Sequence, residues 1–304
     1  MDEEQLLDLI KEMSDSEREL LSEESLSFQA YRKAEKLTDI NHIPFLHYLL
    51  EKTKEIDTRN NIYFILSKIG ANTGDKRVLD ILFKGLETEK NNYLLMRILE
   101  GIAEQRKVED CTPIIKLIND KRHLVRHSAM KAIRACKSCL AEEAIIKIIS
   151  HATDENDLRY ACSVLCEIGT NKSIPYLIYL LQHTKGDTKC SVLWALSELG
   201  DHSLLPIFLN ALEDRSSSVK CYALLAIKKH GDESAINPVI VRIKTILKRK
   251  RTVKSDDLLI GLEFLVRFIK DYKEISDLFD WIKSKKWDLL FDNEKKWINN
   301  FEGL

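Results

Sequence analysis

Apolar residues recur at helical spacing on both sides of Gly200, within residues 185–214 (KGDTKCSVLWALSELGDHSLLPIFLNALED). Two such runs, separated by a short polar break, predict two amphipathic helices. A glycine at such a break can end a helix in a left-handed conformation, so we expect Gly200 and Asp201 to form a tight turn. The stretch therefore predicts an antiparallel helical hairpin.

The same pattern recurs along most of the chain. The turn position after each first helix is occupied, at intervals of 31 to 34 residues, by Thr38, Gly70, Ala103, Lys137, Gly169, Gly200 and Gly231. Eight residues before each turn the chain is apolar, at Ala30, Ile62, Leu95, Ala129, Ala161, Val192 and Ala223. Two short antiparallel helices cannot bury both apolar faces alone, so such hairpins stack on one another. This predicts an all-α solenoid of about seven helical-hairpin repeats with helical caps.

Several of these hairpins resemble a known family. Three first helices read VRHSAMKAIRAC, TKCSVLWALSELGD and VKCYALLAIKKHGD, and second helices include HSLLPIFLNALED and KSIPYLIYLLQ. They resemble HEAT repeats of the short, PBS-lyase-like type, and the resemblance covers roughly residues 25–247. It implies a right-handed α-solenoid, an α-α superhelix in which the second helix of each pair lines the concave face.

The two ends of the chain differ from the repeats. Residues 1–24 carry ten acidic residues, and a short helix with an apolar stripe is expected there, at Leu6, Leu7 and Ile10. Ser14 and Glu17 fit a capping box that opens a second helix. In the last part of the chain, an amphipathic helix is expected over 252–272, followed by short helices that carry Trp281, Trp287 and Trp297. We predict an N-terminal cap over 1–24, a repeat domain over 25–251 and a C-terminal cap over 252–304, with a partner site as the alternative explanation of the tryptophans.

Composition narrows the class of protein. Only 10 glycines and 5 prolines occur, which argues against an all-β fold and against glycine-rich phosphate loops. The formal net charge is −1, so no global field attracts nucleic acid or an anionic membrane, although a local patch such as Lys248–Arg249–Lys250–Arg251 can. Seven cysteines inside helical patterns, no signal peptide and no long apolar run predict a cytoplasmic protein that does not enter the membrane.

Candidate chemical groups are few. Cys136 and Cys139 have redox or half-zinc spacing but lack a second pair, so a structural thiol is expected, as for Cys162 and Cys166. His123 and His127 stand at i, i+4 spacing without the glutamate of a metalloprotease motif, which favours a capping and surface role. His230 is expected at a helix end, at least half-buried. We predict no catalytic residue, no cofactor and no metal.

A row on the second helices is the predicted binding site. When these helices are superposed on their prolines or the equivalent positions, the row and its nearest aromatic neighbour contain Tyr48, Lys84, Lys116, Lys147, Tyr176, Tyr179, Asn210 and Arg242. Basic and tyrosine side chains without an acid suit a protein partner with an acidic surface. The alternative is that this position is only the solvated one on each helix.

Three functions follow. The first is a non-catalytic scaffold or adaptor that holds a protein partner on its concave face, for example as an immunity or assembly protein. The second is a nucleic-acid-binding protein or, by the resemblance, a HEAT-like DNA glycosylase, which the basic row and residues 248–251 favour and the net charge opposes. The third, implied by the resemblance alone, is a bilin-lyase-type chaperone. We favour the scaffold.

Overall fold

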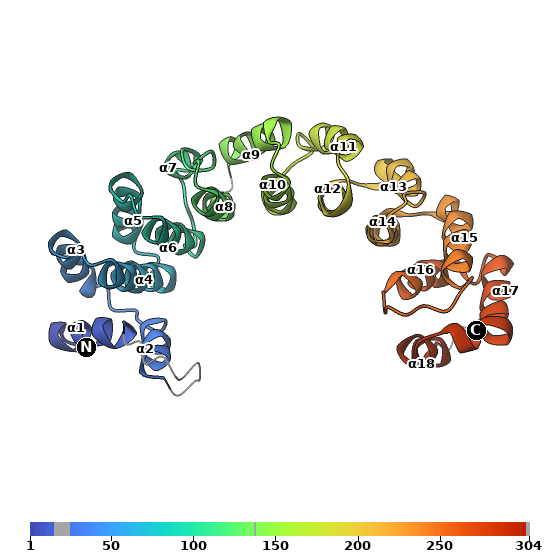
Figure 1. The fold of residues 1–304 in the computed structure, drawn as a ribbon, viewed down its shortest axis with the longest axis horizontal. Coiled ribbons are helices and arrows are strands. Elements are labelled where there is room, and N and C mark those ends of the chain that lie inside the picture. The colour runs from blue at the N-terminus through green and yellow to red at the C-terminus, as the bar shows by residue number, and fades with distance from the viewer. Residues whose placement is uncertain (15–24, 137, 302–304) are drawn as a thin grey trace. The chain divides into compact units, whose positions relative to one another are not determined.

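The computed structural model describes residues 1–14, 25–136 and 138–301 of the chain. All regular elements in these ranges are helices, as predicted (Figure 1). The chain forms two compact units, Met1–Ile148 and Ile149–Leu304, which are described one at a time. The predicted capping partner Glu17 and the predicted turn residue Lys137 lie outside the described residues.

Unit 1 contains the N-terminal helix and the first repeats. Its elements are α1 (Glu3–Met13), α2 (Leu26–Ala34), α3 (His42–Lys52), α4 (Ile56–Thr73), α5 (Lys76–Thr88), α6 (Asn92–Ala103), α7 (Thr112–Ile115), α8 (His123–Ala132), the 3₁₀ turn η1 (Ile133–Ala135) and most of α9 (Cys139–His151).

Unit 2 continues the helical pairs. Its elements are α10 (Glu155–Ile168), α11 (Ile174–His183), α12 (Gly186–Leu199), η2 (His202–Leu204), α13 (Leu205–Ala211), α14 (Ser217–His230), η3 (Glu233–Ala235), α15 (Ile236–Ile246), α16 (Asp257–Leu265), η4 (Val266–Phe268), α17 (Lys273–Trp281), the π-helical η5 (Ile282–Lys286), η6 (Trp287–Leu289) and α18 (Asp292–Asn300).

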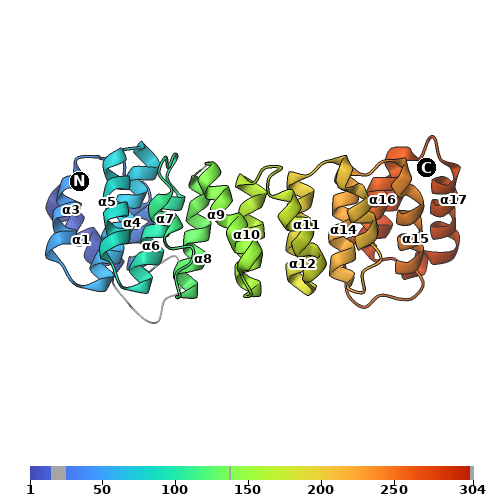
Figure 2. The same cartoon turned by 90° about the horizontal axis from the view of Figure 1, so that it is seen from above.

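The repeat register predicted from the sequence is confirmed by burial. The apolar residues eight positions before each turn are all buried: Ala30, Ile62, Leu95, Ala129, Ala161, Val192 and Ala223. They lie on the first helices, which pack directly against one another, α4 on α6 on α8 in unit 1 and α10 on α12 on α14 in unit 2 (Figure 2). The second helices pack on the first helices and touch each other much less. Each unit is therefore a two-layered stack of helix pairs, as an α-solenoid requires.

The prediction that the second helices line the concave face is wrong. Within each unit, taken by itself, the first helices lie on the inner side of the curve and the second helices on the outer side (Figure 1). Small side chains explain this, because Ala161, Ala195 and Ala223 are fully buried and let α10, α12 and α14 approach closely. The layer with the closer spacing lies on the inside of a curved stack.

The tight turn at Gly200 forms without the predicted left-handed residue. Gly200 is extended, with φ −89° and ψ −176°, and its N–H donates to the carbonyl of Leu196. A Cβ atom there would lie 2.2 Å from Leu204 Cδ1 and 2.7 Å from the Leu196 carbonyl oxygen, so glycine is needed for space. The Asp201 side chain then accepts the N–H of Ser203 at 2.8 Å and starts the next helix.

One predicted turn glycine is displaced. Gly70 lies inside α4, which runs one turn further to Thr73 and ends at Gly74 with φ 76°, in the left-handed region. The buried residues of α4 end at Ile69 and Gly70, one turn before the helix itself ends, so the apolar pattern by itself marked the wrong glycine as the end of the helix.

Helices at both ends pack on the repeats. Helix α1 buries Leu6, Leu9 and Ile10 against α2 and α4, while Leu7 is only half-buried. At the other end, α16 begins at Asp257, later than predicted, and packs on α14 and α15. All three C-terminal tryptophans are half-buried. The boundaries 1–24, 25–251 and 252–304 stay a prediction. No helix in the described ranges is both long and apolar enough to span a membrane.

Replacing Gly200 with alanine should destabilise the protein by about 1–3 kcal/mol, because the new methyl group overlaps a backbone carbonyl that cannot move freely. Urea unfolding followed by circular dichroism measures the change. Ser218→Ala, on the exposed side of α14, is the control and should stay within about 0.5 kcal/mol of the parent. A similarly small effect at Gly200 would contradict the packing explanation.

Candidate binding surface

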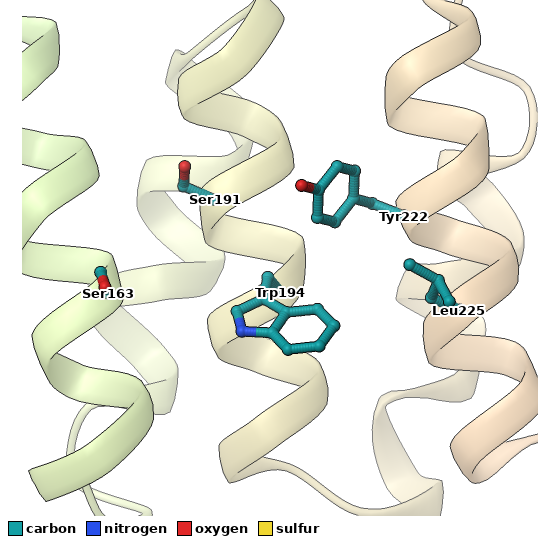
Figure 3. Close-up of a pocket in the computed structure, with 5 residues that line it drawn as sticks. All are labelled: Ser163, Ser191, Trp194, Tyr222 and Leu225. Carbon is teal, nitrogen blue, oxygen red and sulfur yellow. The ribbon is translucent and has the colours of Figure 1, made fainter. Parts of the chain in front are cut away.

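An aromatic cleft lies on the first-helix layer of unit 2. It has a volume of about 330 Å³ and is lined by Ser163 of α10, Ser191 and Trp194 of α12, and Tyr222 and Leu225 of α14 (Figure 3). Trp194 is 42% exposed although it stands in the middle of a packed helix. An exposed tryptophan beside a concave apolar surface is typical of a binding site.

The repeat itself builds this cleft. The lining residues form two rows in which successive members are 31 residues apart. One row contains Ser163, Trp194 and Leu225, and the other contains Ser191 and Tyr222. Each row therefore occupies equivalent positions on neighbouring first helices. The residues that flank Trp194 in sequence, Leu193 and Ala195, are fully buried between the layers. The indole therefore points out of the stack from a rigid support.

Trp194 and Tyr222 form an edge-to-face pair. Their ring centroids are 6.4 Å apart and the ring planes meet at 88°. Such pairs contribute about 0.5–1.5 kcal/mol beyond the area that they bury. The hydroxyl of Ser191 donates to the carbonyl of Asp187 at 3.1 Å, so it is already bonded within its own helix. The cleft thus offers mainly aromatic and aliphatic surface held in a defined orientation.

Charged groups around the cleft are paired across successive repeats. Lys229 of α14 contacts Glu198 of α12 at 3.1 Å, and Arg159 of α10 lies 3.8 Å from Asp187 of α12. These pairs stand at opposite ends of α12, beyond Trp194 on either side. Opposite charges in contact cancel at a distance, so the cleft itself carries little net field.

The binding row predicted from the sequence lies on the second-helix layer. In unit 1 one of its lysines is paired with an acidic residue. Tyr48, Lys84, Lys116 and Lys147 are all exposed. Lys84 lies 3.5 Å from Glu51 of α3, however, so its charge is partly offset. The Tyr48 ring lies 5.3 Å from the ammonium group of Lys52.

In unit 2 the residues of the predicted row are exposed as far as Asn210, whereas Arg242 is not. Tyr176, Tyr179 and Asn210 are exposed, and the Tyr179 ring stacks on His183 with centroids 4.1 Å apart. Arg242 instead turns inward to Asp257 of α16 at 2.6 Å, and its side chain is 12% exposed.

The error at Arg242 arose from superposing the helices on proline. Pro206 stands at the start of α13, whereas Pro238 falls one residue later relative to the start of α15. Measured from the turns at Gly200 and Gly231, the equivalent of Asn210 is Val241, which is 62% exposed. A one-residue shift on a helix rotates the side chain by about 100°, from the surface to the neighbouring helix.

The family model for HEAT repeats matches residues 142–217, which include α10 and α12 of the cleft. Residues 142–217 are HEAT repeats. The protein YibA of Escherichia coli has a similar fold, with a TM-score of 0.53 and 18% identity over 88% of this chain and 99% of that one.

Two further solved structures show weaker likenesses to this chain. The complex of CpcE and CpcF of phycocyanin lyase from Nostoc sp. gives a TM-score of 0.44 and 15% identity, over 74% of this chain and 94% of that one. An engineered protein gives 0.47 and 16%, over 93% and 85%. No curated protein matches the chain at a significant level.

The cysteines predicted to be structural lie mostly inside the helical stack. Cys136 is buried, and burial raises the pKa of its thiol to about 12. Burial also raises the pKa of Cys162 well above its ordinary value. Cys139, by contrast, is exposed. Groups of three or more metal-ligating side chains do not occur in residues 1–14, 25–136 and 138–301.

The predicted role of His230 is confirmed, and the capping and surface role predicted for His123 and His127 is correct only in part. His230 is half-buried at the end of α14, and its Nε2 lies 2.7 Å from the carbonyl oxygen of Ser197 in the last turn of α12. His123 and His127 lie edge to face, with centroids 6.0 Å apart. Neither is the N-cap residue of α8, which is Arg122 and makes no side-chain capping bond, but His123 is exposed, as the predicted surface role requires.

Trp194 was missed as a site residue because the search for outward positions followed only the second helices. The available signal was a large aromatic at a position that neighbouring repeats fill with Ser163 and Leu225, next to residues that have to be buried. A tryptophan that breaks the pattern on the outward side of a repeat indicates a contact surface.

Arg242→Ala should lower the free energy of unfolding by about 3–5 kcal/mol, because it leaves the buried Asp257 carboxylate without its partner. Chemical unfolding of the single variants and of Arg242→Ala/Asp257→Ala measures the coupling between the two residues. The double variant should lose less than the sum of the single losses. Strict additivity would show that the pair is not an internal bond.

At pH 8, Cys139 should react with a thiol reagent at least about 100-fold faster than Cys136, because a buried thiol of raised pKa supplies little thiolate. Ellman's reagent follows the rates in the native protein. Cys139→Ser should remove a fast phase that Cys136→Ser retains. A fast phase lost on replacing Cys136 would overturn this assignment.

Proposed function

We propose that this protein is a non-catalytic binding scaffold that holds a protein partner on the first-helix layer of unit 2. The observation that carries the proposal is the exposed Trp194, paired edge to face with the half-buried Tyr222 in the cleft on α10, α12 and α14. Repeats that stack side by side present a continuous surface, which suits them to hold another chain.

The chemistry of the cleft supports a protein partner with an apolar anchor. Tryptophan and tyrosine are the residues most enriched at energetically important contacts, since they bury a large area and lose little conformational freedom. Trp194 is already oriented by its packed helix and by Tyr222, so binding would cost little further ordering. With the surrounding charges paired, an apolar side chain of the partner is the natural occupant.

The second-helix row is the rival surface for the same function. An acidic partner would meet Lys116, Lys147 and the Tyr179–His183 stack on that layer. The internal bond of Arg242 and the contact of Lys84 with Glu51 weaken this row as a charged surface. We therefore place the partner on the first-helix layer and use the row as the control.

Trp194→Ala and Tyr222→Ala should each weaken partner binding by about 2 kcal/mol or more, roughly 30-fold, since truncated aromatic anchors typically cost this much. The full chain is first used to capture proteins from its source cells. Proteins retained by the parent and lost with Trp194→Ala are then purified and titrated by calorimetry.

Tyr179→Ala is the matched control, because it removes an exposed aromatic from the other layer of the same unit. It should leave the measured affinity within about twofold. Thermal unfolding confirms that each variant is folded. Loss of binding with Tyr179→Ala but not with Trp194→Ala would move the partner to the second-helix row and refute the cleft.

A further inference from the structure

A second exposed surface of unit 2 is strongly basic. The connection between α15 and α16 contains Lys248, Arg249, Lys250 and Lys254, all exposed, and no acidic residue occurs anywhere in 244–255. Within the described parts of the chain, none of these four side chains forms an ion pair. The segment thus presents four positive charges within seven residues, none of them in an ion pair, and the first acidic residue after it is Asp256.

The remaining basic residue of the run fixes the connection to the fold. Arg251 turns inward and donates two hydrogen bonds to the Glu294 carboxylate, both at 2.6 Å, and one to the carbonyl of Leu289 at 3.1 Å. Its guanidinium lies 4.7 Å from the centroid of the Phe291 ring. Glu294 is only 1% exposed, so this bond is a structural anchor to α18.

This anchoring matters for binding. Because Arg251 is held by α18, its neighbours Lys250 and Lys248 are kept at the surface on a segment whose path is set. Fewer conformations of the backbone have to be lost when a ligand binds, so more of the electrostatic attraction is retained.

The composition of residues 248–254 favours a polyanion over a protein interface or a membrane surface. Val253 is the only apolar residue in 248–254, so the segment cannot form the apolar centre that a protein interface requires. It also lacks the hydrophobic residues that insert into a membrane surface. Consecutive cations do favour binding to a dense polyanion, because each phosphate that they neutralise releases condensed counterions.

We infer that residues 248–254 bind the phosphate backbone of nucleic acid, without reading its sequence. The surface is separate from the Trp194 cleft, so the inference does not depend on the proposed protein partner. A net charge of −1 for the whole chain limits long-range attraction and leaves binding to this local patch.

The test is fluorescence anisotropy of the full chain with a labelled duplex of 20 base pairs, at 50 to 200 mM KCl. With four phosphate contacts, the logarithm of the association constant should fall against the logarithm of salt with a slope of about −3.6. Affinity should therefore drop by about 100-fold over this range. No binding at 50 mM KCl would overturn the inference.

The variant Lys248→Glu/Arg249→Glu/Lys250→Glu/Lys254→Glu keeps Arg251 and should abolish binding. The control is Lys33→Glu/Lys36→Glu/Lys172→Glu/Lys273→Glu, which changes the net charge equally at exposed positions elsewhere. It should retain at least a third of the affinity. An equal loss in both variants would show a general charge effect and refute the assignment to residues 248–254.

Two further measurements keep the test decisive. If the glutamate variant is destabilised, replacing the same four residues with glutamine should still flatten the salt slope by about three to four. Vesicles containing phosphatidylserine serve as the competing polyanion. If these residues bind the vesicles more tightly than the duplex, a membrane surface is the ligand and the inference is wrong. Trp194→Ala should leave binding of the duplex unchanged.

Discussion

Close packing of the first helices is the constraint on which each unit depends. Fully buried small residues such as Ala161, Ala195 and Ala223 allow α10, α12 and α14 to approach, and the same layer in unit 1 is built from α4, α6 and α8. Within one helix pair the turn is equally tight, because a methyl group at Gly200 would overlap the Leu196 carbonyl and the Leu204 side chain. The approach of these helices sets the curvature of each unit and decides which side chains face its inner side.

The ion pairs show how the units use their charged residues. Lys229–Glu198 and Arg159–Asp187 join successive first helices, while Arg242–Asp257 and Arg251–Glu294 attach the last helices. The two arginine pairs are largely buried, so removing one partner would strand a charge away from water. Many basic residues that stand out in the sequence are therefore structural, and those without a partner are the informative ones.

Two surfaces of unit 2 have different physical characters. The Trp194–Tyr222 cleft is aromatic, and the charges at both ends of α12 are paired. The segment 248–254 is almost purely electrostatic. The first suits a contact whose strength comes from excluded water, and the second suits one that weakens steeply with salt. The two proposed ligands, a protein and a polyanion, would therefore bind at separate places on unit 2.

The sequence by itself determined the helical class, the repeat and its register, because apolar spacing and turn residues act locally and recur every 31 to 34 residues. It also identified Cys136 as a buried thiol and His230 as a residue of a helix end. Only the tertiary structure decided which layer faces inward, since that depends on how closely neighbouring repeats approach. It alone showed that Arg242 is bonded to Asp257, where a shift of one residue turns a side chain from solvent to core. Trp194 likewise becomes a candidate site residue only in the structure, because the cleft needs residues from three successive first helices and no single repeat contains it.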